Sequence, residues 1–137
     1  MDWKECNVRK FVKIAERDDS LIFSLVESAE SKLKVAKSIP QNEISYSSII
    51  VLAYDSLRTL LEAVASKSGY KIYNHECFTS FLNEILHKNS LAEKFDSVRA
   101  VRNRINYYGR KLTMAEFEVL YNDVKNVQTT AFKPWRS

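Results

Sequence analysis

The chain has 137 residues, enough for one domain that buries about two thirds of the surface exposed by its unfolded form. Two glycines and two prolines leave little turn chemistry for a many-stranded β fold, so helices are favoured. No apolar run approaches the roughly 18 residues of a membrane span, and no signal-like segment follows Met1. Two cysteines, Cys6 and Cys77, are too few for a disulfide framework. These features predict a soluble cytoplasmic protein without a membrane partner.

Apolar residues recur at helical spacing from the start of the chain. A short first helix is predicted over residues 8–15, on the spacing of Val8, Phe11, Val12 and Ala15. A polar run interrupts it, and a second helix follows from about residue 20. That helix ends at Ile39-Pro40, because a residue before proline is disfavoured in the helical conformation. A long central helix is predicted from about Glu43 to Ser68, in the most apolar segment.

Two glycines, Gly69 and Gly109, stand where a left-handed residue ends a helix. Between them, a shorter helix over residues 78–85 precedes the helix that runs through Ile105. Thr113 and Glu116 form a capping box for the last helix. Because short connections between long helices favour antiparallel neighbours, the predicted fold is all-α. We expect an up-and-down antiparallel bundle of four main helices plus one or two short helices, in a single domain of residues 1–137 with a frayed tail at 132–137.

The positive charge of the chain is concentrated in one segment. Residues 99–111 contain five basic side chains and no acidic one, whereas the whole chain has 21 Lys plus Arg and 17 Asp plus Glu. Outside this segment, acidic and basic residues therefore nearly balance. Such a local excess predicts an anion-binding site, for which phosphate is the commonest ligand.

Arg102 is the most informative residue of this basic segment. It lies within about 50° of the centre of the apolar stripe of its helix, so its guanidinium is expected to point toward packed surface, where an arginine needs a partner. A polar ridge runs beside it, formed by Arg99, Asn103 and Asn106. Guanidinium and amide groups suit phosphate and base edges, and a neighbouring tyrosine can stack on a base for roughly 1–3 kcal/mol. In the alternative interpretation, this face is solvated and Arg102 pairs with Asp55 or Glu62.

Three segments together carry a family resemblance. They are residues 53–63, with Tyr54, Asp55 and Arg58; residues 69–76, from Gly69 to His75-Glu76; and Arg102-Asn103 through Gly109. From about Asp19 to Val127 the chain resembles the HEPN (higher eukaryote and prokaryote nucleotide-binding) domain family. These proteins are helical bundles that typically dimerise and often act as metal-independent ribonucleases. The resemblance implies a homodimer that binds a nucleotide or RNA, in a toxin-antitoxin type system.

The catalytic signature of that family is an arginine, four to six intervening residues and a histidine, commonly with a polar residue after the arginine. Arg102 and Asn103 match it, but Tyr107, Tyr108 and Gly109 occupy the following positions where histidine is expected. Histidine exchanges protons near neutral pH, whereas tyrosine, with a pKa near 10, is a poor base. Ribonuclease activity is therefore expected to be weakened or lost. On an ideal helix Arg102 and Tyr107 point about 140° apart, so they share a site only if the helix ends early or two subunits contribute.

These considerations define two groups of candidate residues. The candidate catalytic residues are Arg102, Asn103 and Tyr107. The candidate nucleotide- or RNA-binding residues are Arg99, Arg102, Asn106, Tyr108 and Arg110. In a competing hypothesis, the protein is a non-catalytic adaptor that uses the same face to dimerise or to hold a nucleotidyltransferase, an enzyme with which some HEPN proteins are paired.

A metal site is the remaining alternative. His75 and Cys77 form a His-x-Cys pair and His87 follows, but structural zinc needs four ligands, so neither a metal nor a cofactor is predicted. His75 is interpreted as the start of a helix and Cys77 as a small packing residue. The aromatic and basic run Tyr70–Tyr73 is interpreted as a turn that shields the core rather than as a contact to nucleic acid.

Overall fold

The computed structural model describes the backbone of residues 1–136 and the side chains of residues 1–130. Its long helices are α2 (Asp19–Ser38), α3 (Tyr46–Lys67), α5 (Asn89–Tyr108) and α6 (Met114–Arg136). The shorter elements are the helices α1 (Trp3–Val8) and α4 (Glu76–Ser80), the π-helical turn η1 (Phe81–Ile85) and the strands β1 (Val12–Ile14) and β2 (Tyr70–Ile72). The predicted all-α bundle of four main helices with two short ones is confirmed. In the part of the chain that is described, no helix has the length and apolarity to cross a bilayer.

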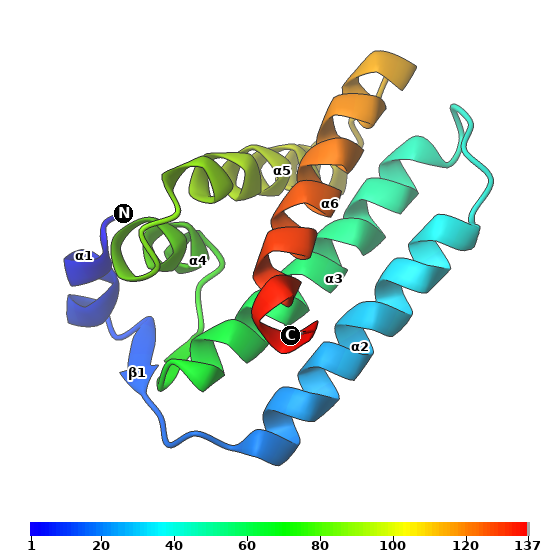
Figure 1. Cartoon of the computed structure of the whole chain (residues 1–137). Coiled ribbons are helices and arrows are strands. Elements are labelled where there is room, and N and C mark those ends of the chain that lie inside the picture. Colours follow the sequence, from blue (N-terminus) through cyan, green and yellow to red (C-terminus); the bar gives the residue numbers. More distant parts are fainter. Residues whose placement is uncertain (137) are drawn as a thin grey trace.

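Helix α3 is the centre of the bundle. It packs against α2, α5 and α6, and α2 and α3 run side by side in opposite directions (Figure 1). Residues on almost every side of α3 are buried, as expected for a helix surrounded by other elements. The turn before α3 is held by Asn42, whose side-chain oxygen accepts hydrogen bonds from the backbone N–H groups of Ile44 and Ser45. This turn reverses the chain and sets the antiparallel pair.

Helix ends follow the predicted signals. Gly109 caps α5 with a φ of 63°, and Gly69 follows α3 with a φ of 88°, both in the left-handed region that glycine tolerates. The capping box of α6 is confirmed, because the Thr113 hydroxyl accepts from the backbone of Glu116 and the Glu116 carboxylate accepts from the backbone of Thr113. The backbone of α6 continues to Arg136, and Ser137 lies outside the described residues. Fraying of the tail 132–137 stays a prediction.

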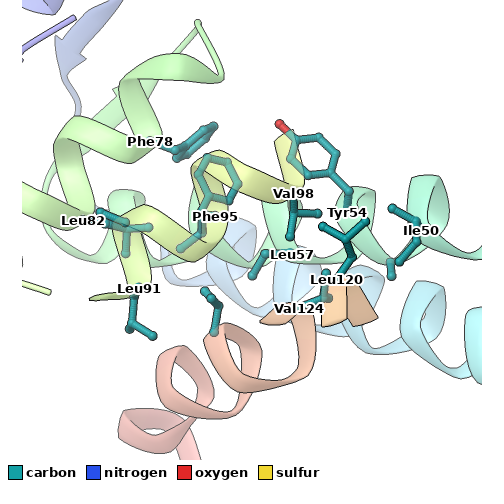
Figure 2. Close-up of a cluster of buried hydrophobic side chains, with 14 of the residues drawn as sticks. Ile50, Tyr54, Leu57, Phe78, Leu82, Leu91, Phe95, Val98, Leu120 and Val124 are labelled. Atoms are coloured by element: carbon teal, nitrogen blue, oxygen red, sulfur yellow. The ribbon is translucent and has the colours of Figure 1, made fainter. Parts of the chain in front are cut away.

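The core beneath the candidate site joins three elements. The ring of Phe95 on α5 stacks on Tyr54 of α3 at a centroid distance of 5.6 Å, and Phe78 of α4 meets it edge-on at 6.2 Å. Figure 2 shows these rings with Val98 beside them and the Tyr54 hydroxyl at the edge of the cluster. The predicted apolar stripe of α5 is buried through Val98. The prediction that Tyr108 belongs to this buried stripe is wrong. Tyr108 is 84% exposed, because no other described element covers the last turn of α5.

The prediction of a helix over residues 8–15 is wrong. Helix α1 ends at Val8, Lys10 turns the chain with a φ of 60°, and β1 follows. Strand β1 pairs in antiparallel fashion with β2, so that Val12 lies opposite Ile72 and both are buried. β-Branched residues favour extended backbone, and pairing with a distant strand prevails over the local helical spacing. Residues 70–72, expected as a turn, supply that strand.

A disulfide joins Cys6 of α1 to Cys77 of α4, and both residues are fully buried. Cys77 is buried, as the interpretation as a small packing residue requires, but its sulfur is also bonded to Cys6. The two cysteines are separated by 71 positions, and they meet because α1 packs on α4. A disulfide is typical of oxidising compartments, so the two cysteines do not support the predicted cytoplasmic localisation. Cytoplasmic localisation stays a prediction.

Candidate anion-binding site

Helix α5 directs Arg102 toward α3, as predicted. Its guanidinium carbon lies 5.2 Å from the centre of the Tyr54 ring, an arrangement in which the ring face attracts the cation. Its Nη1 donates to the side-chain oxygen of Asn103 at 3.2 Å. Its Nε is buried and has no acceptor among the described residues. A buried donor without a partner costs about 1–3 kcal/mol, so this nitrogen is an unsatisfied donor among the described residues.

The alternative in which a carboxylate neutralises Arg102 is not supported by the contacts. Glu62 instead forms an ion pair with Arg58, one helical turn earlier on α3. Between the described residues no ion pair connects Arg102 with Asp55. Arg102 is therefore held by a ring face and an amide, and it forms no ion pair with a described residue.

His75 is the second functional group of the site. It stands at the N-terminus of α4, and its Nδ1 lies 3.1 Å from the Tyr54 hydroxyl. Burial, together with the positive charges of Arg58 and Arg102, lowers the pKa of His75 to about 4. Burial raises the pKa of Tyr54 to about 12. Near neutral pH both groups are uncharged, and a neutral imidazole has a lone pair able to accept a proton.

Two further arginines surround this pair with fixed positive charge. Arg99 donates to Asp96 at 2.8 Å, and Asp96 also accepts from the Thr79 hydroxyl at 3.3 Å. Arg58 is held by its ion pair with Glu62. Both arginines act electrostatically on His75, yet each already has a carboxylate partner. The site thus combines two arginines that are held in ion pairs with one, Arg102, that forms no ion pair with any residue whose side chain is described.

The half-buried His75 predicts a pH dependence of stability. We expect the free energy of unfolding to fall as the pH decreases from about 6.5 toward 4, because the unfolded chain protonates His75 near pH 6.5 and the folded protein only near 4. One pKa unit corresponds to about 1.4 kcal/mol. Since the ring is only half-buried, solvent screening reduces the total loss to roughly 1–2 kcal/mol.

Urea unfolding measured on both sides of this pH range tests the prediction. The matched variant is His75→Asn, which retains a side-chain hydrogen-bonding group but does not titrate. Wild type should lose more stability on acidification than the variant. An equal loss in the two proteins would assign the acid sensitivity to other groups.

The predicted site residues divide into separate places. Arg99, Arg102 and Asn103 belong to the cluster around Tyr54 and His75. Asn106 lines a shallow pocket with Asp55 of α3. The other three lie at the end of α5: Tyr107, which is 74% exposed, the exposed Tyr108, and Arg110. Within one chain, Arg102 and Tyr107 therefore have different surroundings, one against α3 and one toward solvent.

The charge of the basic segment is partly neutralised by acids that lie outside it. Asp96 pairs with Arg99 from one turn upstream, and Glu116 pairs with Arg110 across the turn into α6. The backbone oxygen of Arg110 also accepts from the Ser47 hydroxyl at 3.2 Å. Arg110 therefore contacts both α3 and α6 at the junction between helices. Its charge is paired with a carboxylate, whereas Arg102 has no ion pair with a described residue.

Sequence reasoning missed the roles of three residues at this site, Tyr54, Arg58 and His75. Each lies in a segment that carries the family resemblance, and that is the signal that pointed toward them. The family signature places the proton-transfer group after Arg102 on the same helix, where this chain has Tyr107. The structure brings His75 to the site from α4, 27 positions earlier in the chain.

The His-x-Cys pair offers no thiolate for a metal, because Cys77 is bonded to Cys6. Over the residues with described side chains, there is no group of three His, Cys, Asp or Glu placed to hold a metal ion. The contacts define an all-α bundle with an arginine-rich polar cluster between α3, α4 and α5. No family model matches the chain, and neither a curated protein nor a solved structure matches it.

Proposed function

We propose that the protein is a HEPN-like domain that acts as a homodimer and binds phosphate groups of RNA or of a nucleotide through Arg102. The observation that carries the proposal is the buried Nε of Arg102, which has no acceptor among the described residues. A guanidinium presents donors in a planar fork that matches two phosphate oxygens. A phosphate beside Arg102 would satisfy this donor and compensate its charge.

The neighbouring groups suit the same ligand. Asn103 already contacts the guanidinium and carries an amide able to donate to an oxygen. Arg58 and Arg99 add positive potential, although Glu62 and Asp96 partly offset it. The ligand is therefore expected to bind at one strongly desolvated contact supported by long-range attraction.

His75 supplies a proton-accepting group despite the tyrosine at the motif position. With a pKa of about 4 it is a weak base in the free protein. A bound phosphate favours the imidazolium form and raises the pKa of His75, bringing it nearer to the range in which it would accept a proton from a 2′-hydroxyl. We propose binding as the principal activity and metal-independent cleavage as a weak accompanying one.

The decisive experiment compares single-stranded RNA binding by wild type and Arg102→Met, a variant that retains an apolar stem over Tyr54 but removes the charge. A charge-assisted hydrogen bond contributes about 1.5–3 kcal/mol, so we expect roughly a 10- to 100-fold loss of affinity. The slope of log affinity against log salt should fall by about 0.7, the contribution of one phosphate contact to a single strand. In the presence of a metal chelator, Arg102→Met should also cleave the same RNA more slowly than wild type, because it binds the RNA more weakly.

Arg104→Met is the matched control, since Arg104 lies on the same helix but is exposed. It removes the same charge and should change affinity by no more than an exposed ion pair contributes, roughly 0–1 kcal/mol. Thermal melting of both variants verifies that they fold. Equal RNA affinity of wild type and Arg102→Met would exclude the proposed site, and cleavage that persists in His75→Asn would exclude His75 as the base.

A second candidate function, the adaptor, is favoured by a different observation. Large apolar and aromatic side chains are exposed at the two interhelical turns beside the end of α5. They are Ile44, Tyr107, Tyr108 and Met114. Exposed aromatics are typical of protein interfaces, and a nucleotidyltransferase or a second copy of the chain would cover them. In that case Tyr107→Ser with Tyr108→Ser would weaken the assembly measured by light scattering, and Arg102→Met would leave RNA affinity unchanged.

A further inference from the structure

A second polar site lies on the opposite side of α3 from Arg102. Tyr54 and Ser56 are two positions apart on this helix, so their side chains point about 160° apart. Tyr54 faces α5 and His75, whereas Ser56 contacts Ala29 of α2 and Gln128 of α6. In Figure 1, α2 and α6 flank α3, and a groove of about 370 Å³ is lined by residues of both flanking helices.

Gln128 lines this groove and is only 3% exposed. Its amide nitrogen donates to the Ser56 hydroxyl oxygen at 2.9 Å, and the Ser56 hydroxyl donates its one proton to the backbone oxygen of Ala29 at 2.6 Å. Ser56 can therefore only accept from Gln128, which fixes the orientation of the amide. The Oε1 atom of Gln128 is left buried, and no donor reaches it among the described residues.

The remaining lining is dominated by positive charge. Lys34 and Lys37 approach from α2 and Lys125 from α6, while Glu30 is the one acidic residue of the described lining. The Lys125 ammonium lies 4.7 Å from the centre of the Tyr121 ring, one turn earlier on α6. Lysine ammonium groups are strongly hydrated point charges that suit phosphate. The volume falls within the range of about 300–1,000 Å³ that is typical of small-molecule sites.

We infer that this groove binds a small phosphate monoester that also carries a hydroxyl or amino donor. The lysines would hold the phosphate, and the donor would reach the Oε1 atom of Gln128. A sugar phosphate and a nucleoside monophosphate share this chemistry. Inorganic phosphate cannot combine both contacts at the same strength, because it lacks the donor-bearing arm. The inference does not depend on the proposed function, since it uses other residues on another face of α3.

Two probes, ribose 5-phosphate and adenosine 5′-monophosphate, are titrated into the isotope-labelled full chain and followed by nuclear magnetic resonance. The Arg102→Met background removes the other proposed phosphate contact. We expect shifts of the Gln128 side-chain amide and of the Lys34 and Lys37 backbone signals with at least one probe. Inorganic phosphate should produce the same shifts only at higher concentration. A response to the nucleotide alone would identify the donor as a base amino group.

Three variants separate the two contacts. Gln128→Leu removes the buried acceptor and should weaken binding about tenfold, the equivalent of about 1.4 kcal/mol. The double change Lys34→Met with Lys37→Met should weaken binding further and reduce its dependence on salt. The exposed Lys88→Met is the charge control and should bind as wild type does. Absence of shifts at Gln128 with both probes, or unchanged affinity in Gln128→Leu, would overturn the inference. Loss of RNA binding in Arg102→Met leaves this result unaffected, so the two sites fail independently.

Discussion

Replacement of Phe95 by alanine is expected to lower the free energy of unfolding by about 3–5 kcal/mol, the usual cost of removing a buried aromatic ring. Phe95 is fully buried between Tyr54 and Phe78, so its loss separates three elements that meet at one ring. Small domains have only about 5–15 kcal/mol of stability in total. Urea unfolding followed by circular dichroism measures the change.

The matched control is Phe23→Ala, because Phe23 lies on α2 with 70% of its surface exposed. Its replacement should stay within about 0.5 kcal/mol of wild type. Phe95→Leu retains much of the apolar volume and should fall between the two. If Phe95→Ala were as stable as Phe23→Ala, this result would contradict the packing of Tyr54 against α5 and therefore the position of Arg102 on the Tyr54 ring. Where Phe95→Leu folds, weakened RNA binding would show that Phe95 supports the site through the Tyr54 ring.

The second large effect is expected on removal of the disulfide. The double variant Cys6→Ala with Cys77→Ala should be less stable than wild type by about 4 kcal/mol, within the usual range of about 2–5 kcal/mol, because a cross-link across 71 positions strongly restricts the unfolded chain. Both cysteines are buried, so alanine leaves only small cavities and the cost reflects mainly the lost cross-link. Thermal melting of the oxidised protein and of the variant measures the difference.

A reducing agent supplies the internal control for this experiment. Dithiothreitol should lower the melting temperature of wild type toward that of the double variant and leave the variant unchanged. A wild-type protein that melts at the same temperature with and without the reducing agent would indicate that the two thiols are not joined in solution. Mass spectrometry after alkylation counts the free thiols directly.

The long helices could be predicted from sequence because their signals are local. Apolar spacing, the proline after Ile39, the glycine after α5 and the pair Thr113 and Glu116 each act within a few residues. The strand β1 could not be predicted, since Val12 pairs with Ile72, which lies 60 positions further along the chain. The same distance effect concealed the disulfide. Strand β1 and the disulfide both depend on contacts between distant parts of the chain, which the spacing of nearby residues does not reveal.

The inward direction of Arg102 was predictable from its place on the apolar stripe, and its contact with Tyr54 agrees. The identity of its neighbours was not. A helical wheel compares residues of one helix, whereas His75 reaches the site from another element. The positive surplus of residues 99–111 was also overestimated as a free charge, because Asp96 and Glu116 act on it from outside the counted segment.

The pairing of β1 with β2 also bears on the order in which the molecule assembles. Contacts between α2 and α3 join residues that are close in the chain, so they form at low cost in loop entropy. Val12 can pair only after Ile72 has been synthesised, and Cys6 can form its disulfide only after Cys77 has been synthesised. During synthesis, the helical hairpin can therefore form while the N-terminal segment still has no partner. Val12 and Cys6 are synthesised well before their partners and are among the last residues to reach their final positions, so a nascent chain that ends before β2 exposes Val12 and a free Cys6 thiol.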